Sequence, residues 1–123
     1  MKVIRLGLPL MFWIPLVFAT YMACTPRVHL DMAGNHDKYT HLLAFGYLTG
    51  AFSIVYSRQT TWLRTAGIMI AYGGVIEIVQ AFLPYRSCSW LDIVADGIGI
   101  SLALSGMYAI NKVAGWFKQS VHP

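Results

Sequence analysis

The chain has 123 residues, of which 57% are hydrophobic and 11% are charged, and its mean hydropathy is +0.57. These values exclude an ordinary soluble domain, and the length allows one domain and no more. The net charge of +4 does not indicate a nucleic-acid-binding protein, because the basic residues stand singly between apolar runs and form no patch.

Four apolar runs follow one another along the chain, and each is close to the ~20 residues that a helix needs to cross a hydrocarbon core of ~30 Å. They cover residues 6–24, 39–56, 62–83 and 90–110. We therefore predict an integral membrane protein with an all-α fold, a four-helix transmembrane bundle that forms one domain over residues 1–123. The lipid bilayer is its expected partner, and nucleic acid is not.

The first run resembles a signal peptide in one respect, because two basic residues precede an apolar stretch that ends at Ala23 and Cys24. Against cleavage, Pro9 and Pro15 interrupt the run, and Tyr21 stands where a small residue is expected before a cleavage site. We expect a retained first helix.

The basic residues of the short connections predict the orientation, since Lys and Arg are enriched on the cytoplasmic side. Six lie on one side of the predicted bundle: Lys2, Arg5, Arg58, Arg64, Lys112 and Lys118. Three lie on the other side: Arg27, Lys38 and Arg86. We therefore expect both termini in the cytoplasm and the connections 27–38 and 84–89 outside. Cys24 and Cys88 fall at the outer face, where we expect two unpaired thiols rather than a disulfide.

The second helix carries ionisable residues at its outer end. Asp37, His41 and Phe45 are spaced i, i+4 and i+8 and therefore share a face. Asn35 is a plausible N-cap, which would place Asp37 in a first turn that favours an acid. Helix capping does not explain His41, which lies one turn deeper. His41 is either a hydrogen-bonded packing residue or a functional residue.

The third helix contains the residue that is hardest to explain structurally. Glu77 lies about two turns before Pro84, roughly 10 Å inside the helix end, which is too deep for a capping role. A carboxylate at that depth must pair, become neutral or contact water. Gly73 and Gln80 share its stripe, and Gly73 with Gly74 would allow another helix to approach closely.

The fourth helix begins with Ser89 followed three residues later by Asp92, a pattern that resembles a capping box. Asp96 is one turn deeper on the same face and cannot act as a cap. Small residues continue this face at Gly99, Ala103 and Gly106, and Gly46 and Gly50 form a GxxxG pattern in the second helix. We interpret both sets as helix-packing positions.

Two short connections, 57–61 and 84–89, make the last three helices antiparallel neighbours. His41, Glu77 and Asp96 are then expected at similar depths near the outer leaflet. Arg86 could reach back over them from its connection, and its planar guanidinium suits carboxylate or phosphate.

Four separated blocks of these residues also form a familiar pattern, with order and spacing preserved over residues 37–99. They are Asp37-Lys38-x-x-His41-x-x-x-Phe45, Tyr72-Gly73-x-x-x-Glu77-x-x-Gln80, Leu83-Pro84-x-Arg86 and Trp90-x-Asp92-x-x-x-Asp96-x-x-Gly99. In these blocks the chain resembles the VanZ-like family of small bacterial membrane proteins. It departs from the family pattern at Asp96, where Asn is more frequent.

The resemblance implies a four-helix protein of the bacterial cytoplasmic (inner) membrane, with the motif residues on the extracytoplasmic side. The founding member of the family is associated with reduced susceptibility to teicoplanin, an antibiotic that targets the cell wall. The resemblance therefore indicates a role in the cell envelope and a possible link to antibiotic resistance, without naming a reaction.

Two functions fit these residues. The first is a membrane-embedded enzyme that acts on an envelope or lipid-linked glycan, with Glu77 as general acid or base, His41 as its partner and Asp37 orienting the imidazole. The candidate catalytic residues are Asp37, His41, Glu77 and Asp92. The candidate substrate-binding residues are Lys38, Gln80, Arg86 and Asp96, of which Arg86 and Lys38 would hold an anionic group.

No cofactor is indicated, and the absence of a tight metal-ligand spacing leads us to predict no metal site. A variant of the enzyme hypothesis nevertheless places a divalent cation between Asp92, Asp96, Glu77 and His41.

The second function is a non-catalytic binding module that recognises a lipid headgroup, a wall fragment or a protein partner through the same groups. A transporter is disfavoured, because no inverted repeat is visible. An enzyme predicts an outward-opening pocket lined by Asp37, His41, Glu77, Arg86 and Asp92. A purely structural network predicts that every carboxylate oxygen is satisfied by a protein donor.

Overall fold

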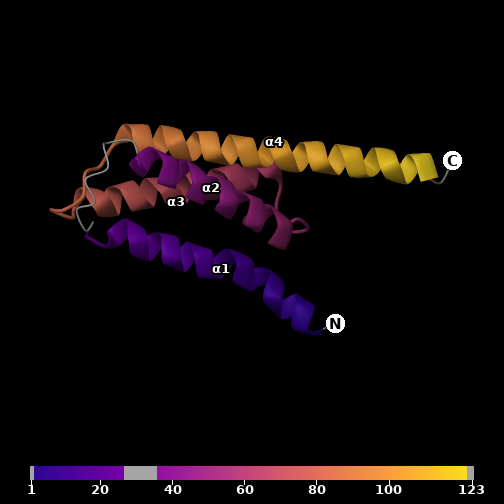
Figure 1. Ribbon diagram of the computed structural model, residues 1–123, viewed down its shortest axis with the longest axis horizontal. Helices are drawn as coiled ribbons and strands as arrows, with labels where there is room; N and C mark the ends of the chain where they lie inside the picture. The colour runs from indigo at the N-terminus through magenta and orange to yellow at the C-terminus, as the bar shows by residue number, and fades with distance from the viewer. Residues whose placement is uncertain (1, 27–35, 122–123) are drawn as a thin grey trace.

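The computed structural model describes residues 2–26 and 36–121, with side chains for residues 7–26 and 36–120. Its four helices are α1 (Lys2–Cys24), α2 (His36–Val55), α3 (Trp62–Ala81) and α4 (Trp90–Val121), and the described residues contain no strand. The predicted all-α fold with four helices is therefore confirmed (Figure 1).

Three of the four helices are long and apolar enough to cross a membrane, over Gly7–Cys24, Trp62–Ala81 and Trp90–Ser120. The remaining helix, α2, has 20 residues but a less apolar sequence, because its first two turns contain His36, Asp37, Lys38 and His41. Its buried face extends from His41 to Phe52, so α2 contributes more to the interior than to a lipid-facing surface.

The helix α4 is longer than its apolar run, which ends near Ile110. It has 32 residues and reaches Val121, which corresponds to about 48 Å against a hydrocarbon core of ~30 Å. The helix continues past the apolar run, because Lys112 and Lys118 interrupt the apolar pattern but are good helix formers. The C-terminal part of α4 therefore extends beyond the other helices (Figure 1).

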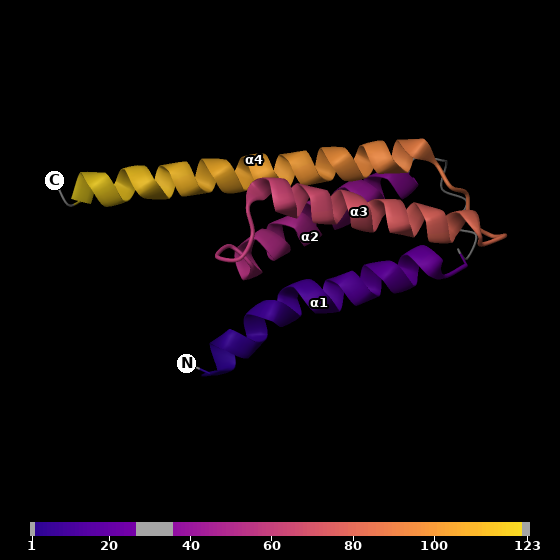
Figure 2. The same cartoon turned by 180° about the vertical axis from the view of Figure 1, so that it is seen from behind.

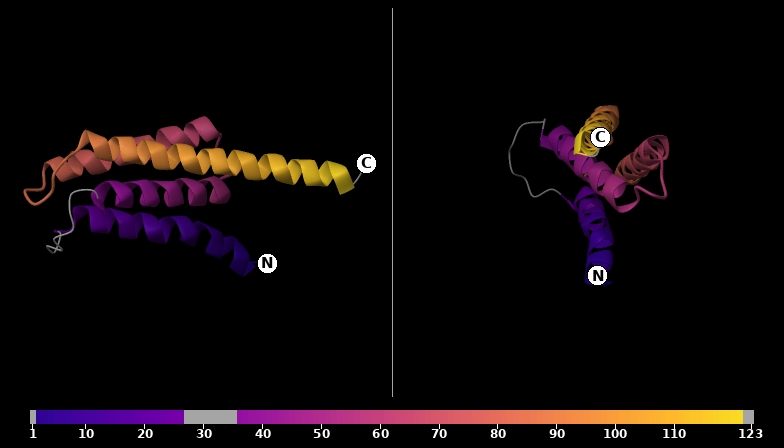
Figure 3. Two further views of the ribbon diagram at one scale, coloured as in Figure 1. Left: turned by 45° about the horizontal axis from the view of Figure 1, so that its top comes forward. Right: turned by 90° about the vertical axis from the view of Figure 1, so that its right-hand side faces the viewer.

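The N-terminal end of α1 and the C-terminal end of α4 lie at the same end of the molecule, opposite the α3–α4 connection and the C-terminal end of α1 (Figures 1 and 2). The interior lies between helices that are distant in sequence: α1 contacts α2 and α3, and α4 contacts the same two helices from the other side (Figure 3). The buried apolar cluster takes at least one side chain from each helix: Phe12, Phe45, Leu48, Ala51, Phe52, Met69 and Ile100.

The helices α2 and α4 approach each other closely at Gly99. A Cβ atom built on Gly99 would overlap the carbonyl oxygen of Leu42 and lie 3.0 Å from the backbone nitrogen of Gly46. The packing role predicted for Gly46 and Gly99 is thus confirmed. No such contact surrounds Gly50 or Gly106, which have open space where a Cβ would be.

The orientation of this bundle remains a prediction that Cys88 can test, because this exposed residue lies in the α3–α4 connection. With Cys24 replaced, we expect Cys88 in intact cells to react with a membrane-impermeant thiol reagent. Labelling that occurs only after cell lysis would reverse the orientation and place the polar end of the bundle in the cytoplasm.

Candidate functional site

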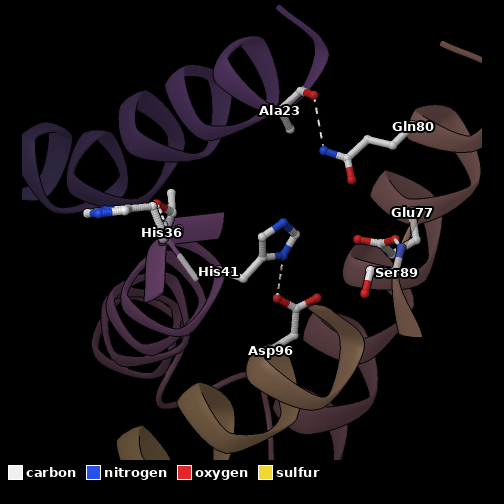
Figure 4. A network of polar contacts seen from close by, with 8 residues as sticks. Ala23, His36, His41, Glu77, Gln80, Ser89 and Asp96 are labelled. Carbon is white, nitrogen blue, oxygen red and sulfur yellow. Dashed lines mark hydrogen bonds and ion pairs between the residues drawn. The ribbon is translucent and has the colours of Figure 1, made fainter. Parts of the chain in front are cut away.

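Four ionisable side chains meet where the N-terminal ends of α2 and α4 lie beside the C-terminal half of α3. We call them the polar cluster: His41, Glu77, Asp92 and Asp96. The three acids are each 2% exposed and His41 is 8% exposed, so all four are withdrawn from the surface. The antiparallel arrangement of α2, α3 and α4 brings them together, as Figure 4 shows for three of them.

His41 and Asp96 form a close, buried hydrogen-bonded pair. The Nδ1 atom of His41 lies 2.8 Å from Oδ1 of Asp96, a bond that joins α2 to α4. An ionised carboxylate can only accept, so Nδ1–H is the donor, and in the neutral ring Nε2 then carries the lone pair. The orienting role that the sequence suggested for Asp37 is therefore filled by Asp96.

The second oxygen of Asp96 explains why position 73 is a glycine. Oδ2 of Asp96 is buried without a hydrogen-bond partner, and a Cβ on Gly73 would lie 2.6 Å from it. Two ring carbons of Phe45 would lie at 3.3 Å from the same Cβ. Gly73 therefore makes room for a carboxylate and an aromatic ring, whereas we had expected it to admit a helix backbone.

One carboxylate oxygen of Glu77 accepts a hydrogen bond from the residue that precedes α4. Its Oε2 accepts the backbone N–H of Ser89 at 3.0 Å, while Oε1 is buried without a hydrogen-bond partner. The predicted capping box would have Asp92 accept the backbone N–H of Ser89. In the structure the acceptor is Glu77 of α3. Asp92 instead lies in the polar cluster, with a carboxylate oxygen within 4.8 Å of ligand atoms of His41 and Glu77.

Two predicted substrate-binding residues point toward the C-terminal end of α1. Gln80 donates from Nε2 to the carbonyl of Ala23 at 3.1 Å, and Arg86 donates to the carbonyls of Thr25, at 3.1 Å, and Met22. The last carbonyls of a helix have no partners within it and carry partial negative charge, so they attract a guanidinium. Arg86 therefore lies on α1 and not over the carboxylates, where we had expected it.

The remaining candidates lie in the first turn of α2, where Asp37 and Lys38 are both half-buried. Asp37 is thus in the acid-favouring turn that the sequence predicted. Its predicted N-cap, Asn35, lies outside the described residues.

The four side chains of the polar cluster are buried in the described part of the chain. Two shallow hollows there lie along α4, one between Val94 and Ser105 and the other between Ala109 and Phe117, and no cluster residue lines either. The expected outward-opening pocket is therefore not among them. A fully satisfied network is not seen either, because Glu77, Gln80 and Asp96 each keep one buried oxygen without a partner.

Comparison with known proteins identifies the family. A model of the VanZ/LLP1 family matches residues 8–111. The chain belongs to this family. The match includes most of α1, which lies outside the four motif blocks of residues 37–99. The VanZ/LLP1 match thus includes α2, α3, most of α1 and α4, and the whole polar cluster.

One relative has a eukaryotic source. An uncharacterised protein of Schizosaccharomyces pombe is 34% identical over 96 residues, which are 76% of this chain and 57% of the relative. The chain thus spans little more than half of the relative's length. No solved structure matches significantly. Because a yeast protein is similar to this one, membership of the VanZ/LLP1 family does not by itself establish a bacterial source, a cell-envelope role or antibiotic resistance.

Cys88 offers a chemical reporter of Glu77 in this VanZ/LLP1 protein. Both cysteines are free thiols, as expected, and a hydrogen bond to the Glu77 carboxylate raises the pKa of the exposed Cys88 thiol above its ordinary value. The thiolate is the reactive form, so we expect Cys88 to react with maleimide more slowly at neutral pH than an ordinary exposed thiol. In a chain without Cys24, Glu77→Gln should speed the reaction and shift its pH profile to lower pH. An unchanged profile would show that the Glu77 carboxylate does not interact with the Cys88 thiol.

Proposed function

We propose that this chain is a membrane-embedded protein whose polar cluster binds and processes the hydroxyl-bearing group of an envelope or lipid-linked glycan. The observation that carries this proposal is the pair of buried carboxylate oxygens without partners, on Glu77 and Asp96. Leaving a buried polar group unsatisfied costs about 1–3 kcal/mol, and more if it is charged. Glycan hydroxyls are donors of the kind that these oxygens lack.

The cluster also has the parts needed for acid–base chemistry. Asp96 holds the His41 ring through Nδ1, which leaves Nε2 to take a proton from a substrate hydroxyl. Glu77, with Oε1 unpartnered, is placed to give or take a second proton. Asp92 completes the candidate catalytic set, and Lys38 remains the candidate partner for a phosphate, since Arg86 is bonded to α1.

We place this function in the cytoplasmic membrane of a bacterium, with the polar cluster toward the extracytoplasmic side, where lipid-linked envelope glycans are handled. Reduced susceptibility to a glycopeptide antibiotic would then be a consequence of changed envelope glycans. The yeast relative favours a lipid-linked group over a wall fragment, because lipid-linked glycans occur in bacteria and eukaryotes alike.

A second candidate is a non-catalytic module that recognises a lipid headgroup, a wall fragment or a protein partner. The burial of the polar cluster favours it, because a binding module needs no open path for product release.

One experiment separates the two candidates. Cells would produce the wild type, Glu77→Gln, His41→Ala or the control Ser101→Ala at matched membrane levels. Ser101 is suitable because its exposed hydroxyl bonds only within α4, to the carbonyl of Gly97. Lipid-linked glycans in the cell extract and lipids retained by the purified proteins would be measured by mass spectrometry.

For an enzyme, we expect the wild type and Ser101→Ala to change the level of at least one lipid-linked glycan, and both cluster variants to leave it unchanged. For a binding module, the extract would not change, but the wild type would retain a lipid that the cluster variants lose. No difference in either measurement would refute the enzyme and a module that binds a lipid headgroup.

A further inference from the structure

We infer that the polar cluster is a binding site for one divalent transition-metal cation, Zn²⁺ or Mn²⁺, with His41, Glu77 and Asp92 as its protein ligands. The three residues come from α2, α3 and α4, and each offers one ligand atom within 4.8 Å of the other two. This inference does not depend on the glycan proposal, since a cation could serve catalysis, binding or the fold. With the cation bound, His41 and Glu77 would act as its ligands and not as the acid and base of that proposal.

The separation of these atoms is close to what a bound cation requires. Nitrogen and oxygen ligands lie about 2.1 Å from such an ion, which places neighbouring ligands about 3–3.5 Å from one another. Side-chain rotations that move each ligand atom by about an ångström would close the site.

Glu77 supplies an independent indication of a ligand. Its side chain is 2% exposed, and Oε1 has no hydrogen-bond partner although Oε2 is bonded to the Ser89 N–H. The Cys88 thiol, a weak donor, interacts with the same carboxylate, so Oε1 lacks a strong N–H or O–H donor. Figure 4 shows the Glu77 carboxylate on the side of α3 that faces His41.

His41 is held in the form that a metal requires. Asp96 accepts from Nδ1, so the lone pair of the neutral ring is on Nε2. Metal-bound histidines commonly donate their other ring nitrogen to a carboxylate in this way, which fixes the tautomer and orients the ring. Asp96 is therefore a positioning residue for the proposed ligand His41.

The charge balance favours a cation as well. Three carboxylates are buried together, on Glu77, Asp92 and Asp96, and Arg86 is bonded to the end of α1. Within the described residues, Lys38 is a further cationic side chain near the cluster, where it interacts with Asp92 electrostatically. One imidazole nitrogen with two carboxylates is a mixed ligand set that suits Zn²⁺ or Mn²⁺ better than Mg²⁺ or Ca²⁺.

The test uses the full chain, purified without a histidine tag in lipid nanodiscs and freed of metal with a chelator. Mn²⁺ binding is measured by electron paramagnetic resonance, and Zn²⁺ is added as a competitor. The variants are Glu77→Gln, Asp92→Asn and Asp96→Ala. His36→Ala is the matched histidine control, because this exposed residue is on the same helix outside the polar cluster. Circular dichroism checks that each variant is folded.

We expect one Mn²⁺ per wild-type chain, displaced by Zn²⁺. The Kd should rise at least tenfold in Glu77→Gln and Asp92→Asn, by about 10–100-fold in Asp96→Ala, and not in His36→Ala. Pulsed measurements on the wild type should show hyperfine coupling to one imidazole nitrogen, a readout that needs no variant. A folded wild type that binds no ion, or bound Mn²⁺ without nitrogen coupling, would overturn the inference. Binding that survives both carboxylate variants would overturn it equally.

Discussion

Glu77→Gln is expected to abolish function while leaving the protein at least as stable as the wild type. Glutamine keeps the shape of the side chain and an oxygen that can accept the Ser89 N–H. It removes a buried carboxylate that costs several kcal/mol when unpaired. Losing a general acid or base lowers a rate by about 10²–10⁴-fold. The two measurements are the thermal unfolding midpoint in nanodiscs and the change in lipid-linked glycans at matched protein levels.

His41→Ala is the companion variant, because it removes the ring but leaves Asp96 buried without its donor. We expect it to lose both function and stability, by about 3–5 kcal/mol for the broken pair. If Glu77→Gln were instead strongly destabilised and both variants stayed functional, the polar cluster would be a structural network and the functional assignment would fail.

Gly99→Ala is expected to force α2 and α4 apart, because the added methyl group would overlap the Leu42 carbonyl oxygen and approach the Gly46 nitrogen. Overpacking typically costs about 1–3 kcal/mol, and the cost should be at the upper end because both obstacles are backbone atoms. Gly97→Ala is the matched control, two residues away on the same helix, where no atom lies within 4 Å of the built Cβ.

The control should be neutral or slightly stabilising, since alanine is the better helix former by up to about 1 kcal/mol. Thermal unfolding in nanodiscs compares the two variants with the wild type. Equal midpoints for Gly99→Ala and Gly97→Ala would show that α2 and α4 are not in close contact at Gly99.

Local sequence patterns predicted the helices well where apolar residues and boundary signals agree. The predicted starts at Trp62 and Trp90 are the observed starts of α3 and α4. The start of α2 at His36 agrees with the N-cap position predicted at Asn35, although the apolar run begins only at Tyr39. Hydropathy and helix formation separate at the end of α4, which continues past the apolar run to Val121. Packing could be predicted for Gly46 and Gly99 but not distinguished from Gly50 and Gly106, because the GxxxG pattern does not say which glycines face a neighbour.

The sequence predicted that His41, Glu77, Asp92 and Asp96 lie close together, because the helical spacing sets the face of each residue and the short connections set its depth in the bundle. The sequence did not predict their hydrogen-bond partners, because each partner depends on a side-chain rotamer or on a distant segment. Asp96 rather than Asp37 holds His41, and the end of α1 attracts Gln80 and Arg86. No local signal in residues 80–86 indicates that α1 ends beside them.

The most direct test of a ligand-binding polar cluster is an experimental structure of the chain, purified from its native membrane without chelator. We predict a non-protein donor or cation within bonding distance of Oε1 of Glu77 and Nε2 of His41, with the His41–Asp96 hydrogen bond preserved. A structure in which Oε1 of Glu77 is bonded to a protein donor, with nothing else bound between α2, α3 and α4, would contradict it.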